Sequence, residues 1–147
     1  MRGDADDIED DELLYRRIPC RPEYHNPGVS DRPSWLAFNP MKQDTTGLSL
    51  YRAKATTPER VASAGRGKGY YVGVLRAGDI RRHEMRIVAT AGDPGGPAGH
   101  VEIIDLTYDL RKSDRVRELE VLLADKLCLD VLGPFTGGGQ ASPHDAC

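Results

Sequence analysis

The sequence predicts an α+β fold, with a small mixed or antiparallel sheet, one long covering C-terminal helix and extended proline-rich loops. Three observations lead to this expectation. Short β-type segments recur along residues 13–106 with few helical patterns between them, so βαβ units are scarce. A helical apolar stripe begins after Ser113. Residues 19–33 contain four prolines, and proline fixes φ and removes a hydrogen-bond donor, so this stretch is a loop.

The strands are expected where β-forming and apolar residues alternate or cluster between turn signals. The segments that meet this description are residues 13–18, 48–53, 70–75, 85–89 and 100–106. Residues 39–47 and 92–99 are polar or rich in glycine and proline, and we expect them to be loops.

Two short helices are expected between these strands. Thr57 is suited to an N-cap and Pro58 to the first helical position, and this helix should end at Gly65. Asp79 is a candidate cap for one or two turns over residues 80–84.

The third predicted helix is the longest. Ser113 caps it, and apolar residues then recur at helical spacing for about eighteen residues. The stripe comprises Val116, Leu119, Leu123 and Leu127, widened by Val121, Leu122 and Leu132.

The chain divides into three parts. Residues 1–12 are acidic and predicted to be disordered, 13–132 form a single α+β domain, and 133–147 form a flexible Gly/Pro tail. No apolar run approaches the roughly 20 residues that cross a bilayer, and the acidic N-terminus lacks a signal pattern. We therefore expect a cytoplasmic protein that does not engage a membrane; the sequence does not indicate its oligomeric state.

Charge is sorted along the chain. Residues 1–12 carry seven acids against one arginine, residues 13–86 carry fourteen Lys and Arg against six acids, and residues 87–147 are acidic again. Basic surface attracts anions, and acidic segments can cover it. The acidic N-terminal segment could therefore fold back over the basic middle.

These charges favour a binding or accessory module without a cofactor, whose arginine-rich face engages an anionic partner, either nucleic acid or an acidic protein surface. Arginine is the better fork for phosphates and carboxylates, and tyrosines lie beside several of the arginines. The candidate anion-binding residues are Arg16, Arg17, Arg52, Arg66, Lys68, Arg81 and Arg82. The competing interpretation is that these cations pair with acids of the same chain.

Familiar motifs are absent. The glycines of residues 65–69 follow a predicted helix and open a strand, the reverse of a dinucleotide fingerprint, and Lys68 is not followed by Ser or Thr as in a P-loop. A glycine hinge is favoured there, with anion contact by Arg66 and Lys68 left open. The four histidines are scattered, so no metal site is expected. His100 and Glu102 share one face of their predicted strand as a conceivable acid–base couple, but no motif fixes a reaction.

Three stretches form a pattern that resembles small uncharacterised bacterial proteins: residues 32–40 (RPSWLAFNP), 47–53 (GLSLYRA) and 99–103 (GHVEI). The chain also resembles the ADP-ribosyltransferase core of the RES type. That resemblance is carried by Arg16 or Arg17 on an early strand, by residues 37–40 (AFNP) and by residues 50–53 (LYRA). It implies, as the alternative function, an NAD-consuming enzyme. Arg17 and Tyr51 would then hold NAD, and Glu102 would orient the ribose.

Overall fold

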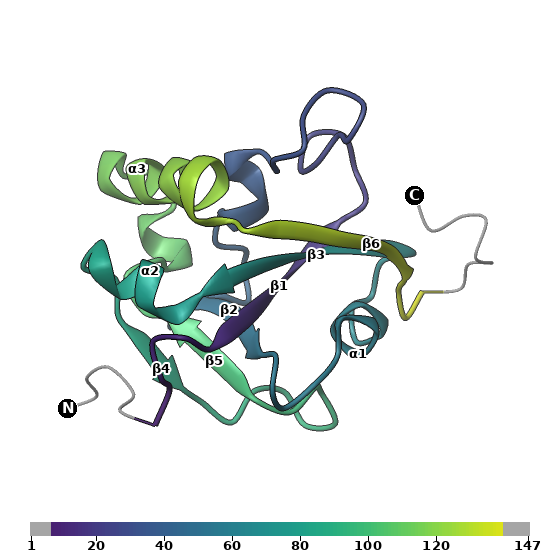
Figure 1. The fold of residues 1–147 in the computed structure, drawn as a ribbon, viewed down its shortest axis with the longest axis horizontal. Helices are drawn as coiled ribbons and strands as arrows, with labels where there is room; N and C mark the ends of the chain where they lie inside the picture. The colour runs from purple at the N-terminus through teal and green to yellow at the C-terminus, as the bar shows by residue number, and fades with distance from the viewer. Residues whose placement is uncertain (1–6, 140–147) are drawn as a thin grey trace.

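The computed structural model describes residues 7–139, and its centre is one six-stranded antiparallel sheet that curls into a half-barrel (Figure 1). The strand order is β4-β5-β2-β1-β3-β6, and each neighbouring pair is antiparallel. The strands are β1 (Leu13–Pro19), β2 (Leu48–Arg52), β3 (Gly69–Arg76), β4 (Ile87–Ala89), β5 (His100–Ile103) and β6 (Asp130–Thr136).

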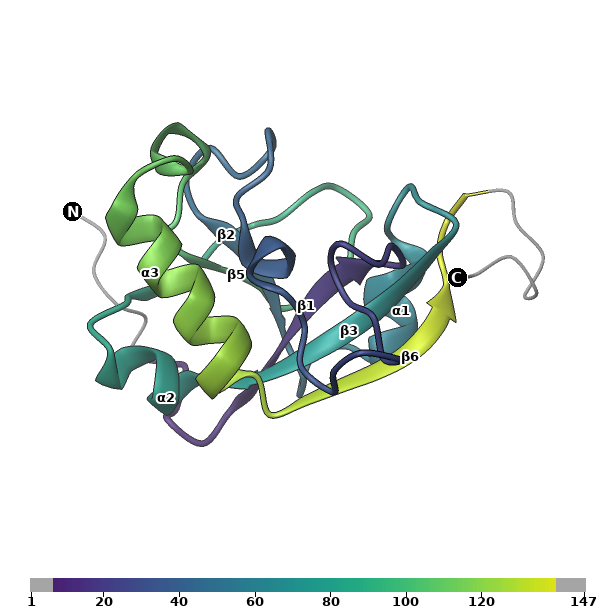
Figure 2. The same ribbon diagram turned by 90° about the horizontal axis from the view of Figure 1, so that it is seen from above.

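Short helices lie on both faces of this sheet. The α-helices are α1 (Pro58–Ser63), α2 (Ala77–Arg82) and α3 (Asp114–Leu122), with 3-10 turns η1 (Trp35–Phe38) and η2 (Tyr108–Leu110) and the π-helical turn η3 (Leu123–Leu127). Figure 2 shows α2 and α3 on one side of the sheet and α1 on the other. Each side has its own apolar cluster. Phe38, Ile80 and Leu119 belong to the larger one, whereas Val61 and Val72 belong to the smaller one beneath α1.

The predicted fold class is wrong in its covering element. The expected helix of about eighteen residues ends early: α3 has nine residues and η3 adds five, and no long C-terminal helix covers the sheet in residues 7–139. The Cys128 N–H donates to the Leu123 carbonyl at 2.8 Å, which closes the π-helical turn, and Cys128 itself is extended. Leu129 N–H then donates to the Val74 carbonyl, and the chain enters β6. Leu132, counted in the helical stripe, lies opposite Val72 in the sheet.

The two short helices are present, with one difference in capping. The Thr57 hydroxyl accepts from the Arg60 N–H, as expected of an N-cap. Asp79 does not cap α2, because that helix begins earlier, at Ala77, and Asp79 lies in its first turn. There its carboxylate pairs with Arg76 at 2.9 Å.

Both ends of the described chain are tied to the domain. Residues 1–6 of the predicted acidic segment lie outside the described residues, but residues 7–12 pack on the fold, where Ile8 is fully buried. At the other end, β6 extends to Thr136, so the first residues of the predicted tail belong to the sheet; residues 140–147 lie outside the described part. No helix within residues 7–139 has the length and apolar character needed to cross a bilayer.

The register of β2 against β5 positions the residues that matter below. Ser49 lies opposite Glu102, and Tyr51 lies opposite His100. Since side chains alternate along a strand, these four residues share one face of the sheet. The intervening residues, Leu50 and Val101 among them, point into the larger core.

Candidate functional site

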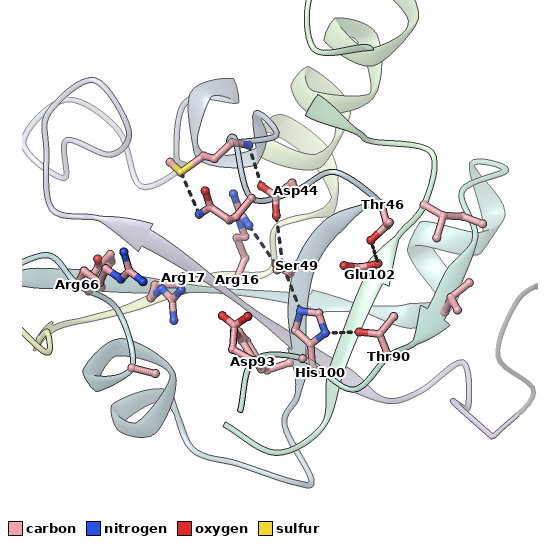
Figure 3. A pocket seen from close by; sticks show the side chains of 18 of the residues that line it. Arg16, Arg17, Asp44, Thr46, Ser49, Arg66, Thr90, Asp93, His100 and Glu102 are labelled. Atoms are coloured by element: carbon pink, nitrogen blue, oxygen red, sulfur yellow. Dashed lines mark hydrogen bonds between the residues drawn. The ribbon is translucent and has the colours of Figure 1, made fainter. Parts of the chain in front are cut away.

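A cavity of about 790 Å³ lies against the face of β1, β2 and β5 that carries these side chains (Figure 3). Arg17 from β1, Tyr51 from β2 and Glu102 from β5 all line it. These three residues, to which the resemblance assigns roles under the enzyme alternative, therefore border one cavity, on three strands that are consecutive in the sheet. A volume of this size is in the range of small-molecule pockets.

Two buried carboxylates line the cavity, Asp44 at 1% exposed and Glu102 at 8% exposed. Glu102 Oε1 accepts a hydrogen bond from the Thr46 hydroxyl at 2.8 Å. Because Thr46 belongs to the loop before β2, this bond ties the loop to β5. A carboxylate fixed in this way holds negative charge in a partly dehydrated place, where it interacts more strongly with a nearby cation than it would in water.

His100 lies two residues before Glu102 and takes part in a separate polar chain. The Ser49 hydroxyl is 3.2 Å from Asp44 Oδ1 and 3.1 Å from His100 Nε2, and His100 Nδ1 contacts the Thr90 hydroxyl. A carboxylate only accepts, so Ser49 donates to Asp44 and accepts from the Nε2–H of His100. The Nδ1 of a neutral His100 then accepts from Thr90.

The direction of these hydrogen bonds determines whether His100 can act as a base toward Ser49. The Ser49 hydroxyl donates its hydrogen bond to Asp44 and not to His100, so His100 is not a base aimed at a serine nucleophile. Burial lowers the pKa of His100, against the raising influence of Glu102, which favours the neutral ring. The Tyr51 ring packs edge-on against His100 with centroids 5.3 Å apart. The network therefore fixes the side-chain orientations of Ser49 and His100 on this wall of the cavity. His100 and Glu102 share that wall, as expected, but the hydrogen bonds described here join them to different partners.

Arg16 and Arg17 are adjacent in the chain and differ in role. Arg16 is buried: its Nε donates to the Ala37 carbonyl and its Nη1 to the Ser49 carbonyl, so it braces η1 against β2. Burial lowers the pKa of this guanidinium. Arg17 is half-buried; its Nη1 donates to the Val61 carbonyl at 3.1 Å, which leaves other N–H groups for a ligand.

Arg66 is the third arginine of the cavity and comes from the glycine-rich loop between α1 and β3. Figure 3 shows it beside Arg17, while His100 and Glu102 lie further along the cavity. The arrangement places cationic groups toward one end and a buried carboxylate toward the other.

The remaining candidate anion-binding residues lie outside the cavity. Arg52 pairs with Glu12 and Asp7 at 2.8 and 3.2 Å. Arg81 pairs with Asp10 at 2.8 Å, and Arg82 lies 3.6 Å from Asp79. Lys68 is exposed in the loop next to Arg66. Acidic residues 7–12 thus lie over part of the basic middle, as the charge pattern suggested.

Sequence reasoning did not single out Asp44, Thr46, Ser49 or Thr90 as site residues. Ser49 shares a strand face with Tyr51, which is a signal available in the sequence, but its partners come from the register of β2 with β5 and from the loops. Within residues 7–139, no group of three or more His, Cys, Asp or Glu side chains is arranged to hold a metal ion.

Comparison with known proteins found no matching protein-family model, no matching curated protein and no matching solved structure.

Proposed function

We propose that the cavity binds NAD and that the protein is an NAD-consuming enzyme of the ADP-ribosyltransferase type. The observation that carries the proposal is the convergence of Arg17, Tyr51 and Glu102 on one cavity from three adjacent strands. These are the residues to which the resemblance gave the roles of holding NAD and orienting its ribose. The broad arginine face is less favoured, because Arg52, Arg81 and Arg82 are engaged with carboxylates.

The chemistry of the reaction matches the charges of the cavity. The bond between the ribose C1′ and the nicotinamide nitrogen breaks, and nicotinamide leaves with the bonding electron pair as a neutral pyridine. Positive charge then develops on the ribose, and a fixed carboxylate stabilises such a cation electrostatically. A water or a nucleophile on a target molecule bonds to C1′ and gives up a proton. Of the two buried carboxylates of the cavity, Asp44 already accepts from the Met41 N–H and the Ser49 hydroxyl. We therefore assign this task to Glu102.

The other residues supply position. Tyr51 is 7% exposed and presents an aromatic ring to the cavity, where it can pack on a flat ring of the ligand. The Thr46 hydrogen bond fixes the Glu102 carboxylate before the ligand arrives. Such preorganisation lowers the reorganisation that the transition state would otherwise require.

The test is to incubate the purified protein with NAD and to measure the release of nicotinamide by chromatography. We expect Glu102→Gln to lower kcat about 100-fold or more, the loss typical of one removed electrostatic stabiliser. Glu118→Gln is the matched control, since Glu118 lies on α3 with its side chain 70% exposed and does not line the cavity. Free ADP-ribose as product would indicate hydrolysis, and ADP-ribose attached to a target would indicate transfer.

Two results would contradict this function. If the wild-type protein releases no nicotinamide, or if Glu102→Gln releases it as fast as the wild type, the enzyme proposal is wrong. Salt-sensitive binding of nucleic acid without NAD turnover would then favour the arginine-rich binding module.

A further inference from the structure

The loop of residues 65–69 contributes a cation to the cavity that the proposed reaction has not used. Arg66 is exposed, lines the cavity, and has no hydrogen bond or ion pair to its guanidinium in the described part of the chain. Arginine is usually found paired or stacked, as Arg52 and Arg117 are here. An unpaired guanidinium at a cavity is available for an anionic ligand.

The loop is held in place although it is rich in glycine. The Gly67 N–H donates to the Tyr70 hydroxyl at 2.6 Å. On its other side, the N–H groups of Gly137, Gly138 and Gly139 donate to loop carbonyls at 2.7 to 3.0 Å. Arg66 is therefore presented from a braced backbone, which reduces the ordering cost of binding.

This bracing depends on close contact between the two backbones. A Cβ added at Gly137 would lie 2.1 Å from the Gly67 carbonyl oxygen, and one added at Gly138 would lie 2.6 Å from the Gly65 carbonyl oxygen. Only glycine fits at these two positions without a shift of the backbone. The glycines after β6 thus have a structural role at the cavity, beyond that of a linker.

Arg17 supplies the second cation at this end. Its guanidinium is restrained by the Val61 carbonyl and by the Tyr70 ring, whose centroid is 5.5 Å away. Tyr70 therefore contacts both the Arg17 side chain and the Arg66 loop. The carboxylate of Asp93 also lines the cavity, but it is exposed and no ion pair between it and either arginine is found within residues 7–139.

We propose that Arg66 and Arg17 form a diphosphate subsite and that Arg66 selects dinucleotides over nucleosides. Two guanidinium groups suit the two negatively charged phosphates of a nucleoside diphosphate, because each fork can donate to more than one phosphate oxygen. The inference rests on the proposed function for its orientation: with the diphosphate at the arginine end, the glycosidic bond lies toward Glu102. The subsite itself makes a prediction that does not depend on catalysis.

The experiment measures binding of ADP and of adenosine by calorimetry. It also measures turnover of two substrates, NAD and nicotinamide riboside, the second of which lacks the diphosphate. Arg66→Ala should weaken ADP binding between tenfold and a hundredfold, the range for hydrogen bonds to a charged group. It should lower kcat/KM for NAD by a similar factor and leave that for nicotinamide riboside unchanged. Arg66→Lys should lose less, since it keeps the charge. Arg60→Ala is the control, because Arg60 is exposed on neighbouring α1 and outside the cavity.

The outcomes separate the two proposals. If Arg66→Ala binds ADP as tightly as the wild type, or if it weakens adenosine and ADP equally, the diphosphate subsite is wrong. If ADP binding depends on Arg66 while the wild type releases no nicotinamide, the subsite stands and the proposed reaction fails. Circular dichroism of each variant tests whether the substitution leaves the fold intact.

Discussion

Glu120 on α3 should make the protein less stable as the pH rises toward neutrality. Its side chain is fully buried, and neither carboxyl oxygen has a hydrogen-bond partner within residues 7–139. The guanidinium of Arg117 approaches it only to 3.7 Å while stacking on Trp35. Burial accordingly raises the pKa of Glu120 to about 7, despite the opposing charge of Arg117.

The change in the free energy of unfolding with pH follows from the difference in the Glu120 pKa between the folded and unfolded states. In the unfolded chain Glu120 ionises near its ordinary pKa of 4.5, whereas in the folded protein it keeps its proton to about pH 7. Between these values the folded state binds more protons, so the free energy of unfolding falls as pH rises. At about 1.4 kcal/mol per unit of pKa difference, the loss reaches about 3 kcal/mol above pH 7.

Urea denaturation at pH 5 and pH 8 tests this expectation. Glu120→Gln cannot ionise, so its stability relative to the wild type should be greater at pH 8 than at pH 5 by about 2 to 3 kcal/mol, because part of the wild-type loss has already occurred at pH 5. All other titrating groups are shared and cancel in this difference. Glu118→Gln removes the same charge from the exposed side of α3, and its stability relative to the wild type should hardly change with pH.

A stability difference between Glu120→Gln and the wild type that is the same at both pH values would refute the reasoning. It would mean that the carboxyl group is solvated, or fully compensated by Arg117, in the folded protein. A shift of similar size in Glu118→Gln would point instead to the total charge of α3.

Two further expectations concern ionisable groups elsewhere. Hydrogen bonds from Arg52 lower the pKa of Glu12 to about 2, so its stabilising contribution is present above pH 4.5 and is lost as pH falls toward 2. Glu12→Gln should destabilise the protein at pH 7 by about 3 kcal/mol, with little effect from Asp11→Asn, and equal urea midpoints for both variants would contradict this. Burial lowers the pKa of His100, so its imidazole resonances in an NMR titration should show a midpoint below 6.5, and a midpoint above that value would contradict the neutral ring assigned here.

The local elements could be predicted because they depend on short patterns. The five predicted strands are all present, and the first helix has the expected cap at Thr57. Alternation and capping are properties of a few neighbouring residues, which the sequence displays directly. The boundaries shift by a few residues, as at β5, which ends at Ile103 rather than at residue 106.

Strand β6 was not predicted, because its formation depends on the rest of the sheet and not on its own residues alone. Residues 127–132 contain enough apolar side chains to continue a helical stripe, and nothing in that segment alone excludes it. What selects β6 is the free edge of β3, where residues 69–74 accept it as a partner. An unpaired edge is a property of the assembled sheet.

The residues of the candidate site also fall into those that could be predicted from the sequence and those that could not. Arg17, Tyr51 and Glu102 could be nominated from a resemblance, each on its own strand. The bonds of Ser49 to Asp44 and His100 could not, because they join residues from a loop and two strands whose register is set by folding.

The distribution of charge along the chain could be interpreted only once the fold showed which charges form ion pairs. Glu12 lies forty residues before Arg52, and the two form a bidentate pair that removes both from the charge available to a ligand. The net charge of a segment therefore says less about binding than the number of its cations left without a carboxylate. Arg16, Arg17 and Arg66 line the cavity without a carboxylate partner among the described residues, but Arg16 is buried and donates to two backbone carbonyls. Arg17 and Arg66 therefore remain for a ligand, and on this basis we propose a small anionic ligand rather than a broad polyanion surface.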